Sequence, residues 1–101
     1  MNEQKIAGLI GLALRARQAV SGADACRLLI RSGECGVLLV DGDAGPNTRK
    51  KAEEQCRSTE TPMRILPAGT IERATGRSNR LLAVRKGGFA IQLCEITGKE
   101  E

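Results

Sequence analysis

The sequence contains no His, Tyr or Trp, and Phe89 is its only aromatic residue. Histidine is the commonest acid–base catalyst at neutral pH, so its absence disfavours an enzyme. Proteins that read single-stranded nucleic acid stack bases on Phe, Tyr and Trp, and the scarcity of these residues disfavours that class too. We therefore expect a protein without a catalytic site and without stacking platforms for unpaired bases.

Long apolar runs are also missing. The longest uncharged stretch, residues 6–14, is far too short to span a bilayer. The first residues lack the basic start and small-residue cleavage site of a signal peptide. These absences predict a cytoplasmic protein that does not contact a membrane.

The four cysteines, at positions 26, 35, 56 and 94, do not form a metal-binding pattern. No two of them are two to four residues apart, and there is no His to complete a zinc site. Three of the four fall on apolar helix faces or at strand ends, where cysteine acts as a small hydrophobe. The glycines form neither G-x-G-x-x-G nor a phosphate-binding loop. We predict reduced thiols in the core, no metal and no cofactor.

Apolar periodicity divides the 101 residues into alternating helices and strands of one domain, residues 1–97, followed by a disordered tail at 98–101. The third helix begins at Pro46, a residue favoured at the first helical position. In the last helix, Phe89, Ile91 and either Leu93 or Cys94 are expected to face the core. The alternation implies a central sheet with helices on both faces. The predicted helices cover residues 3–15, about 22–32, 46–60, 70–75 and 88–96, and the predicted strands 19–21, 36–41, 63–66 and 81–84.

Positive charge is concentrated in two stretches, residues 4–23 and 73–94, which together carry eight cations and no acid. The whole chain has a net charge of +4, so the remainder is net negative. Arginine supplies eleven of the sixteen cations, and its planar fork suits phosphate and guanine edges. This distribution favours contact with a polyanion, although a solvated charged surface is the plain alternative.

Each basic stretch contains one candidate contact motif. Ser21 or Gly22 is expected to cap the second helix, whose free N–H groups and dipole could hold an anion. Glycine at that point would let a nucleic-acid backbone approach closely. The segment 76–80, G-R-S-N-R, is a loop of donors without an acid, able to contact phosphates or base edges. An ordinary helix cap and an ordinary polar turn remain alternatives.

Several short segments together resemble a known family: G-L-A-x-R-A (11–16), V-S-G (20–22), I-R-S-G (30–33), L-L-V-D-G-D-A (38–44) before N-T-R-K-K, and T-G-R-S-N-R (75–80). The pattern is similar to the bacterial branch of the 7Ae/30e-type ribosomal proteins, the kink-turn RNA binders. The resemblance covers nearly the whole chain.

This resemblance implies a three-layer α/β/α sandwich with a four-stranded mixed sheet, without catalysis or cofactor. It also implies RNA binding through the start of the second helix and the loop before the last strand. Arg85 is a further candidate for phosphate contact. The residues expected to bind RNA are Arg15, Arg17, Gln18, Ser21, Gly22, Ala23, Asp24, Arg77, Ser78, Asn79 and Arg80.

The chain departs from the family's usual pattern in both regions. After the glycine, kink-turn binders usually continue x-N-E-x-x-K, where this chain has Asp24, Ala25 and Leu28. The usual Gly-Lys before the short strand appears as Arg17-Gln18, and apolar loop residues are replaced at 77–79. Each missing base-edge pair removes roughly 1–3 kcal/mol of discrimination. We therefore expect a binder that uses its backbone and arginines.

The main hypothesis is a monomeric cytoplasmic protein that binds structured RNA, kink-turn-like or ribosomal. A protein-interaction module of the same fold is the alternative, and a contiguous exposed apolar patch would favour it. A small thiol or nucleotide enzyme is a third possibility, which a selectively reactive cysteine would support.

Overall fold

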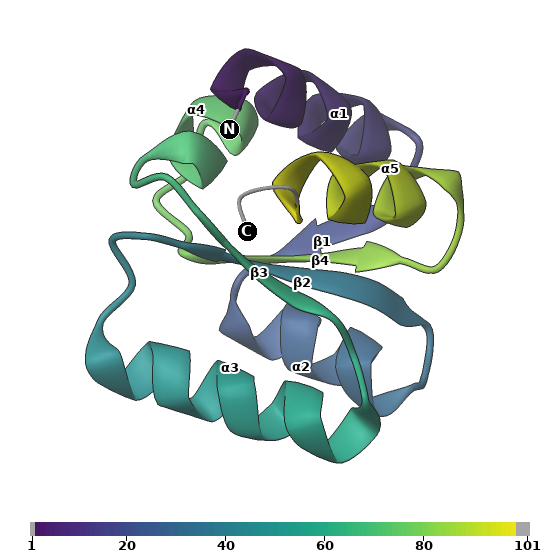
Figure 1. Cartoon of the computed structure of the whole chain (residues 1–101), viewed down its shortest axis with the longest axis vertical. Coiled ribbons are helices and arrows are strands. Elements are labelled where there is room, and N and C mark those ends of the chain that lie inside the picture. The colour runs from purple at the N-terminus through teal and green to yellow at the C-terminus, as the bar shows by residue number, and fades with distance from the viewer. Residues whose placement is uncertain (1, 99–101) are drawn as a thin grey trace.

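Helices and strands alternate along the whole described chain. A computed structural model describes residues 2–98, and all nine predicted elements are found there (Figure 1). Their bounds agree with the sequence patterns to within one residue at most ends, so apolar periodicity was a sufficient guide to the elements. They are α1 (Glu3–Arg15), β1 (Ala19–Ser21), α2 (Ala23–Arg31), β2 (Cys35–Asp41), α3 (Pro46–Thr59), β3 (Met63–Leu66), α4 (Thr70–Thr75), β4 (Leu81–Arg85) and α5 (Gly88–Thr97).

The four strands form one mixed sheet in the order β1-β4-β2-β3. Only β2 and β3 run parallel, whereas β4 is antiparallel to both β1 and β2. Helices α1, α4 and α5 cover one face and α2 and α3 the other, as Figure 1 shows. The predicted three-layer α/β/α sandwich with a four-stranded mixed sheet is therefore confirmed.

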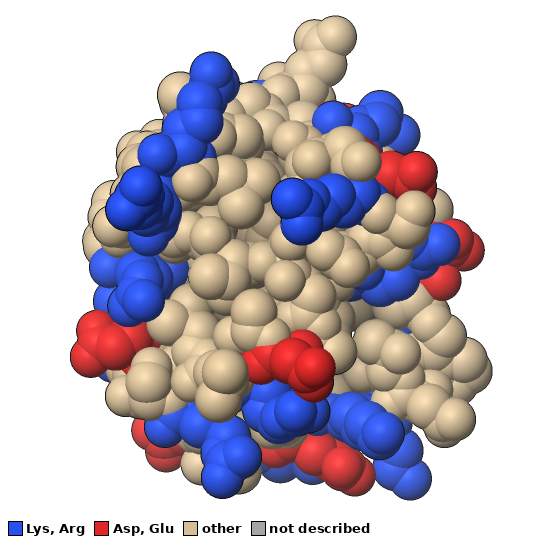
Figure 2. Space-filling model, turned by 180° about the vertical axis from the view of Figure 1, so that it is seen from behind, with Lys and Arg blue, Asp and Glu red and all other residues tan. Residues whose placement is uncertain are grey.

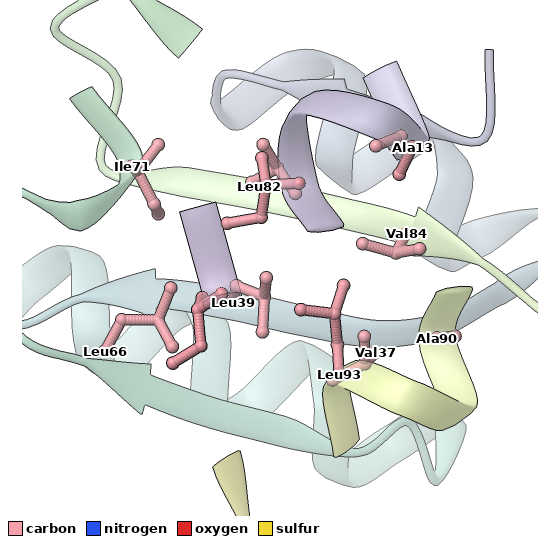
Figure 3. Packing of buried hydrophobic residues seen from close by; sticks show 12 residues of the cluster. Ala13, Val37, Leu39, Leu66, Ile71, Leu82, Val84, Ala90 and Leu93 are labelled. Carbon is pink, nitrogen blue, oxygen red and sulfur yellow. The ribbon is translucent and has the colours of Figure 1, made fainter. Parts of the chain in front are cut away.

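Alternate residues of the central strands serve two separate cores. Val37 and Leu39 of β2 pack beneath α1 and α5, with Leu93 of α5 among their neighbours (Figure 3). Leu38 and Val40, which point the opposite way, pack against α2 and α3. Because both faces are covered, β2 reads as a continuous apolar run rather than an alternating one.

The cysteines line these cores as free thiols. Cys26, Cys35 and Cys56 are buried, and Cys94 is half-buried. Burial raises the pKa of Cys26 to about 12 and that of Cys56 to about 11, with the nearby Cys35 adding to both shifts. The prediction of core cysteines is confirmed.

The prediction that Ile91 faces the core is wrong, since its side chain is 61% exposed. Helix α5 instead buries Ala90, Leu93 and Thr97, which share one helical face. Gly36 permits this packing, because a Cβ there would lie 2.6 Å from that of Ala90. Phe89 is partly buried, as expected.

Only the first residue of the tail expected at 98–101 is described. Gly98 caps α5, and the rest of the tail expected at 98–101 lies outside the described residues. Within residues 2–98, every helix is too short or too polar to cross a membrane.

Candidate nucleic-acid interface

Gly22 stands where β1 turns into α2. Its backbone has φ +96° and ψ 153°, a conformation that side-chain-bearing residues rarely adopt. No side chain caps this helix start, and the first intrahelical bond runs from the Cys26 N–H to the Gly22 carbonyl. The N–H groups of residues 23–25 therefore have no intrahelical acceptor and are suited to an anion. Of the two expected caps, Gly22 is confirmed.

Ser21 is not the cap. It is the last residue of β1, and its hydroxyl accepts a hydrogen bond from the Asn79 amide at 3.0 Å. The Gly22 N–H donates to the Leu81 carbonyl, also at 3.0 Å. The Asn79 amide lies 3.8 Å from the point where a Cβ on Gly22 would be. The two candidate motifs, distant in sequence, thus form one continuous surface.

The loop 76–80 is shaped by short-range hydrogen bonds. Gly76 ends α4 with φ +74°, and the Arg77 N–H donates to the Thr75 hydroxyl at 3.1 Å. The Arg77 and Ser78 side chains are exposed. Arg77 is therefore available to an anionic partner.

Arg80 is held more firmly than Arg77. Its guanidinium donates to the Ser78 carbonyl at 3.1 Å and pairs with the Asp43 carboxylate at 3.3 Å. The Asp43 N–H in turn donates to the buried Asp41 carboxylate at 2.8 Å. Sequence analysis did not assign Asp43 a role, although it stands within the L-L-V-D-G-D-A segment. This residue orients Arg80 and partly neutralises it.

Asp24 is the one acid on the helix start. Its side chain is 89% exposed and pairs with Arg27 at 2.9 Å, one helical turn further on. This arginine, which the sequence analysis also missed, offsets the repulsion that Asp24 would exert on a phosphate. The i,i+3 spacing of the pair was the available signal.

The remaining expected contact residues lie elsewhere. Arg15, Arg17 and Gln18 lie at the opposite end of β1 from Gly22, where α1 ends. The Gln18 carbonyl accepts from the Arg85 N–H at 2.7 Å, so Arg85 belongs to this end as well. The structure therefore divides the predicted set into two groups, one at each end of the edge strand.

Figure 2 shows the charge on the side of the molecule where β1 forms the edge of the sheet. Along its upper left margin, Lys and Arg atoms form a column without acidic atoms among them. Toward the bottom, basic and acidic side chains alternate. The basic surface is thus uneven, with its acid-free part at one margin.

Other kinds of site have less support. Within residues 2–98, no three His, Cys, Asp or Glu side chains are grouped to hold a metal. A cavity of about 620 Å³ lies at the start of β2, beside Gly36 and Ile91, away from Gly22. The exposed large hydrophobic residues stand on four different elements: Leu12 on α1, Leu28 on α2, Ile65 on β3 and Ile91 on α5.

Comparison with known proteins identifies the family, although no family model matches the chain. The RNA-binding protein YlxQ of Bacillus subtilis (strain 168) is 34% identical over 90 residues, which cover 87% of this chain and 90% of that protein. The chain belongs to the YlxQ family. This family places it in the 7Ae/30e-type superfamily, as its sequence segments predicted. The YlxQ protein of Enterococcus faecium is 29% identical over 96 residues, covering 94% and 93% of the two chains.

Solved structures share the fold of this chain. A Bacillus halodurans protein of unknown function superposes with a TM-score of 0.86 at 29% identity, covering 94% of this chain and 98% of its own. The Giardia lamblia 15.5kD RNA binding protein superposes with a TM-score of 0.76 at 17% identity, covering 95% and 84%. At that identity the second match establishes the fold alone.

Proposed function

We propose that this YlxQ-family protein is a non-catalytic cytoplasmic protein that binds structured RNA through the start of α2 and the loop 76–80. Two curated relatives of nearly the same length are named RNA-binding proteins. The observation that carries the proposal is the Asn79–Ser21 hydrogen bond, which joins the loop to the helix start. One RNA segment can therefore touch both.

Each part of this surface has a distinct task in the proposal. The free N–H groups after Gly22 bind a phosphate, aided by the dipole of α2. Arg77 and Arg80 neutralise phosphates on either side, and Ser78 offers its hydroxyl. Most of these contacts go to the RNA backbone, so they fix its position and shape rather than its sequence.

The RNA class that fits is one recognised by shape, kink-turn-like or ribosomal. Asp24, Ala25 and Leu28 supply none of the base-edge donors that the family's usual Asn and Lys would supply. Leu28 is 66% exposed on α2 and offers only an apolar surface. We propose that bent RNA is preferred, because a surface that contacts mainly the backbone distinguishes RNAs by their shape.

Titration with three RNAs tests this function. The probes are a kink-turn hairpin, a straight duplex of equal length and an unstructured single strand, each labelled and followed by fluorescence anisotropy. The proposal predicts the tightest binding for the kink-turn and weak, salt-sensitive binding for the other two. Equal affinity for all three would contradict the shape preference, and no binding to any would contradict RNA binding itself.

A further inference from the structure

Arg17 has a backbone conformation that glycine normally supplies. Its φ of +60° is left-handed, and it follows the last turn of α1. Its N–H donates to the Leu14 carbonyl at 3.1 Å, and the Gln18 N–H donates to the Ala13 carbonyl at 2.8 Å. This pair of bonds is the Schellman motif, in which the left-handed residue is usually Gly. An arginine in this place costs roughly 1–2 kcal/mol of backbone strain, as Glu60 does at the end of α3 with φ +56°.

Other exposed cations lie beside Arg17. Arg85 is fixed next to it by the bond from its N–H to the Gln18 carbonyl, and Lys86 follows directly. Arg15 is in the last turn of α1, and its side chain is exposed as well. One acidic residue, Glu34, is hydrogen-bonded to this group of cations through its backbone. Its carbonyl accepts from the Lys86 N–H at 2.9 Å. Positive charge predominates at this end of β1.

These cations differ in their pairing from two of the arginines near Gly22. Among the described residues, the ion pairs of Arg27 and Arg80 engage Asp24 and Asp43. No ion pair within residues 2–98 involves Arg17 or Arg85. Within that part of the chain, no carboxylate competes with an anion for their guanidinium groups.

We infer that Arg17 and Arg85, with Arg15 and Lys86 beside them, form a second contact for RNA phosphates, separate from the surface at Gly22. This inference rests on the proposed function. The three residues of β1 lie between the two contacts and span about 10 Å at roughly 3.3 Å per residue. The second contact thus meets the RNA beyond the segment held at Gly22. It therefore binds the stem that flanks the recognised element.

The test compares two RNAs that share one kink-turn. In one, the stems are trimmed to the kink-turn itself, and in the other each stem is extended by a full helical turn. Wild-type protein should bind the extended RNA more tightly. Each bound phosphate adds about 0.9 to the salt slope, which amounts to about a fourfold change in affinity between roughly 50 and 200 mM salt.

Arg17→Gly is the decisive variant because it should change stability and binding in opposite directions. Glycine adopts the left-handed conformation without strain, so the melting temperature should rise by a few degrees. The affinity advantage of the extended RNA over the trimmed RNA should shrink about fourfold. Arg85→Ala should reduce this affinity advantage by a similar factor without raising the melting temperature. Arg17→Lys should retain most of the affinity advantage.

The possible outcomes distinguish failure of the second contact from failure of the proposed function. If Arg17→Gly and Arg85→Ala leave the extended-to-trimmed affinity ratio at its wild-type value, the second contact does not exist. If both RNAs lose affinity equally, these arginines belong to the Gly22 surface and the inference is also wrong. If the wild-type protein binds neither RNA, the proposed function fails and the inference fails with it.

Discussion

Strand β1 is flanked at each end by a residue with a positive φ, glycine at one end and arginine at the other. At each end the chain turns sharply out of or into a helix and needs a positive φ, which is +96° at Gly22 and +60° at Arg17. The first conformation is essentially restricted to glycine. The second is the left-handed helical region, which other residues reach for roughly 1–2 kcal/mol. At Gly22, backbone N–H groups would bind the RNA phosphate, whereas at Arg17 the side chain would bind it.

The ends also differ in how firmly they are arranged. Around Gly22, side-chain bonds from Asn79 and Asp43 fix the loop 76–80 before any partner arrives. Around Arg17, the contacts that hold the chain are between backbone groups. A prearranged surface loses less conformational entropy on binding, so the Gly22 end should carry the specificity and the Arg17 end mainly charge.

The largest expected effect comes from Gly22→Ala. A methyl group there would clash with nothing, since the nearest atom lies at 3.8 Å, so the effect is one of backbone strain. The free energy of unfolding should fall by about 1–3 kcal/mol. RNA affinity should fall by about tenfold or more because the helix start is displaced from the loop. Chemical denaturation and anisotropy titration measure the two effects.

Gly8→Ala is the matched control for this substitution. Gly8 lies within α1 in open space, where alanine is the better helix former by about 1 kcal/mol. This variant should therefore gain stability and keep its RNA affinity. Equal behaviour of the two alanine variants would remove the special role assigned to Gly22.

Removing the loop arginines should have the next largest effect. Arg77→Ala/Arg80→Ala should lower RNA affinity about tenfold and reduce the salt slope by about 0.9 for each phosphate that is no longer neutralised. Stability should change little, since both side chains lie at the surface. Arg31→Ala/Arg57→Ala removes the same charge from exposed positions at the far ends of α2 and α3. Equal losses of affinity in the two double variants would mean that only net charge matters.

The bond between the two motifs should contribute a smaller amount. A double-mutant cycle of Asn79→Ala and Ser21→Ala should give a coupling energy of about 0.5–1.5 kcal/mol in stability. RNA affinity should fall in the Asn79 variant because the loop is no longer held beside Gly22. Zero coupling would show that the loop is positioned by the β1–β4 pairing alone.

Thiol reactivity should give the smallest effect. Cys26 begins the second turn of α2, and burial raises its pKa from 9.0 to about 12. At pH 8 it is almost wholly protonated in the folded state, so alkylation requires opening of α2. Its rate should rise in Gly22→Ala and stay at the wild-type value in Arg17→Gly, as peptide mass spectrometry can measure. A faster alkylation rate in both variants would mean that the two ends of β1 unfold together as one unit.

The raised thiol pKa also sets a pH dependence. Above pH 9 the unfolded chain loses thiol protons that the folded chain keeps, so the unfolded state is favoured. Stability should therefore decline as pH rises from 9 toward 11, in a window that thermal melts can follow. A melting temperature that stays constant over this range would contradict the burial of Cys26 and Cys56.

Apolar periodicity was enough to predict the elements of this fold, because each helix and strand buries a regularly spaced face. It failed at Ile91, because α5 packs Ala90 against Gly36 of another element, a contact that periodicity does not record. The candidate site was predicted only as two separate segments. Their union depends on a hydrogen bond between positions 58 residues apart, which no local pattern records.

The sequence also did not predict which charged residues pair with one another. The bond between Arg80 and Asp43 depends on β2 and β4 lying side by side, which follows from strand order. The left-handed backbone at Arg17 could not be read from its residue type, since arginine is not usual there. The acid-free stretches 4–23 and 73–94 did include the candidate cations at both ends of β1, because charge segregation is visible in the sequence itself.

The central claim is that RNA binds across the helix start at Gly22 and the loop 76–80. An NMR titration of the labelled protein with a kink-turn RNA tests it most directly, residue by residue. The account predicts that amide signals of residues 22–25 and 76–80 shift most, with Arg17 and Arg85 following only when the stems are extended. Shifts concentrated on α3, or around the cavity beside Gly36 and Ile91, would contradict it.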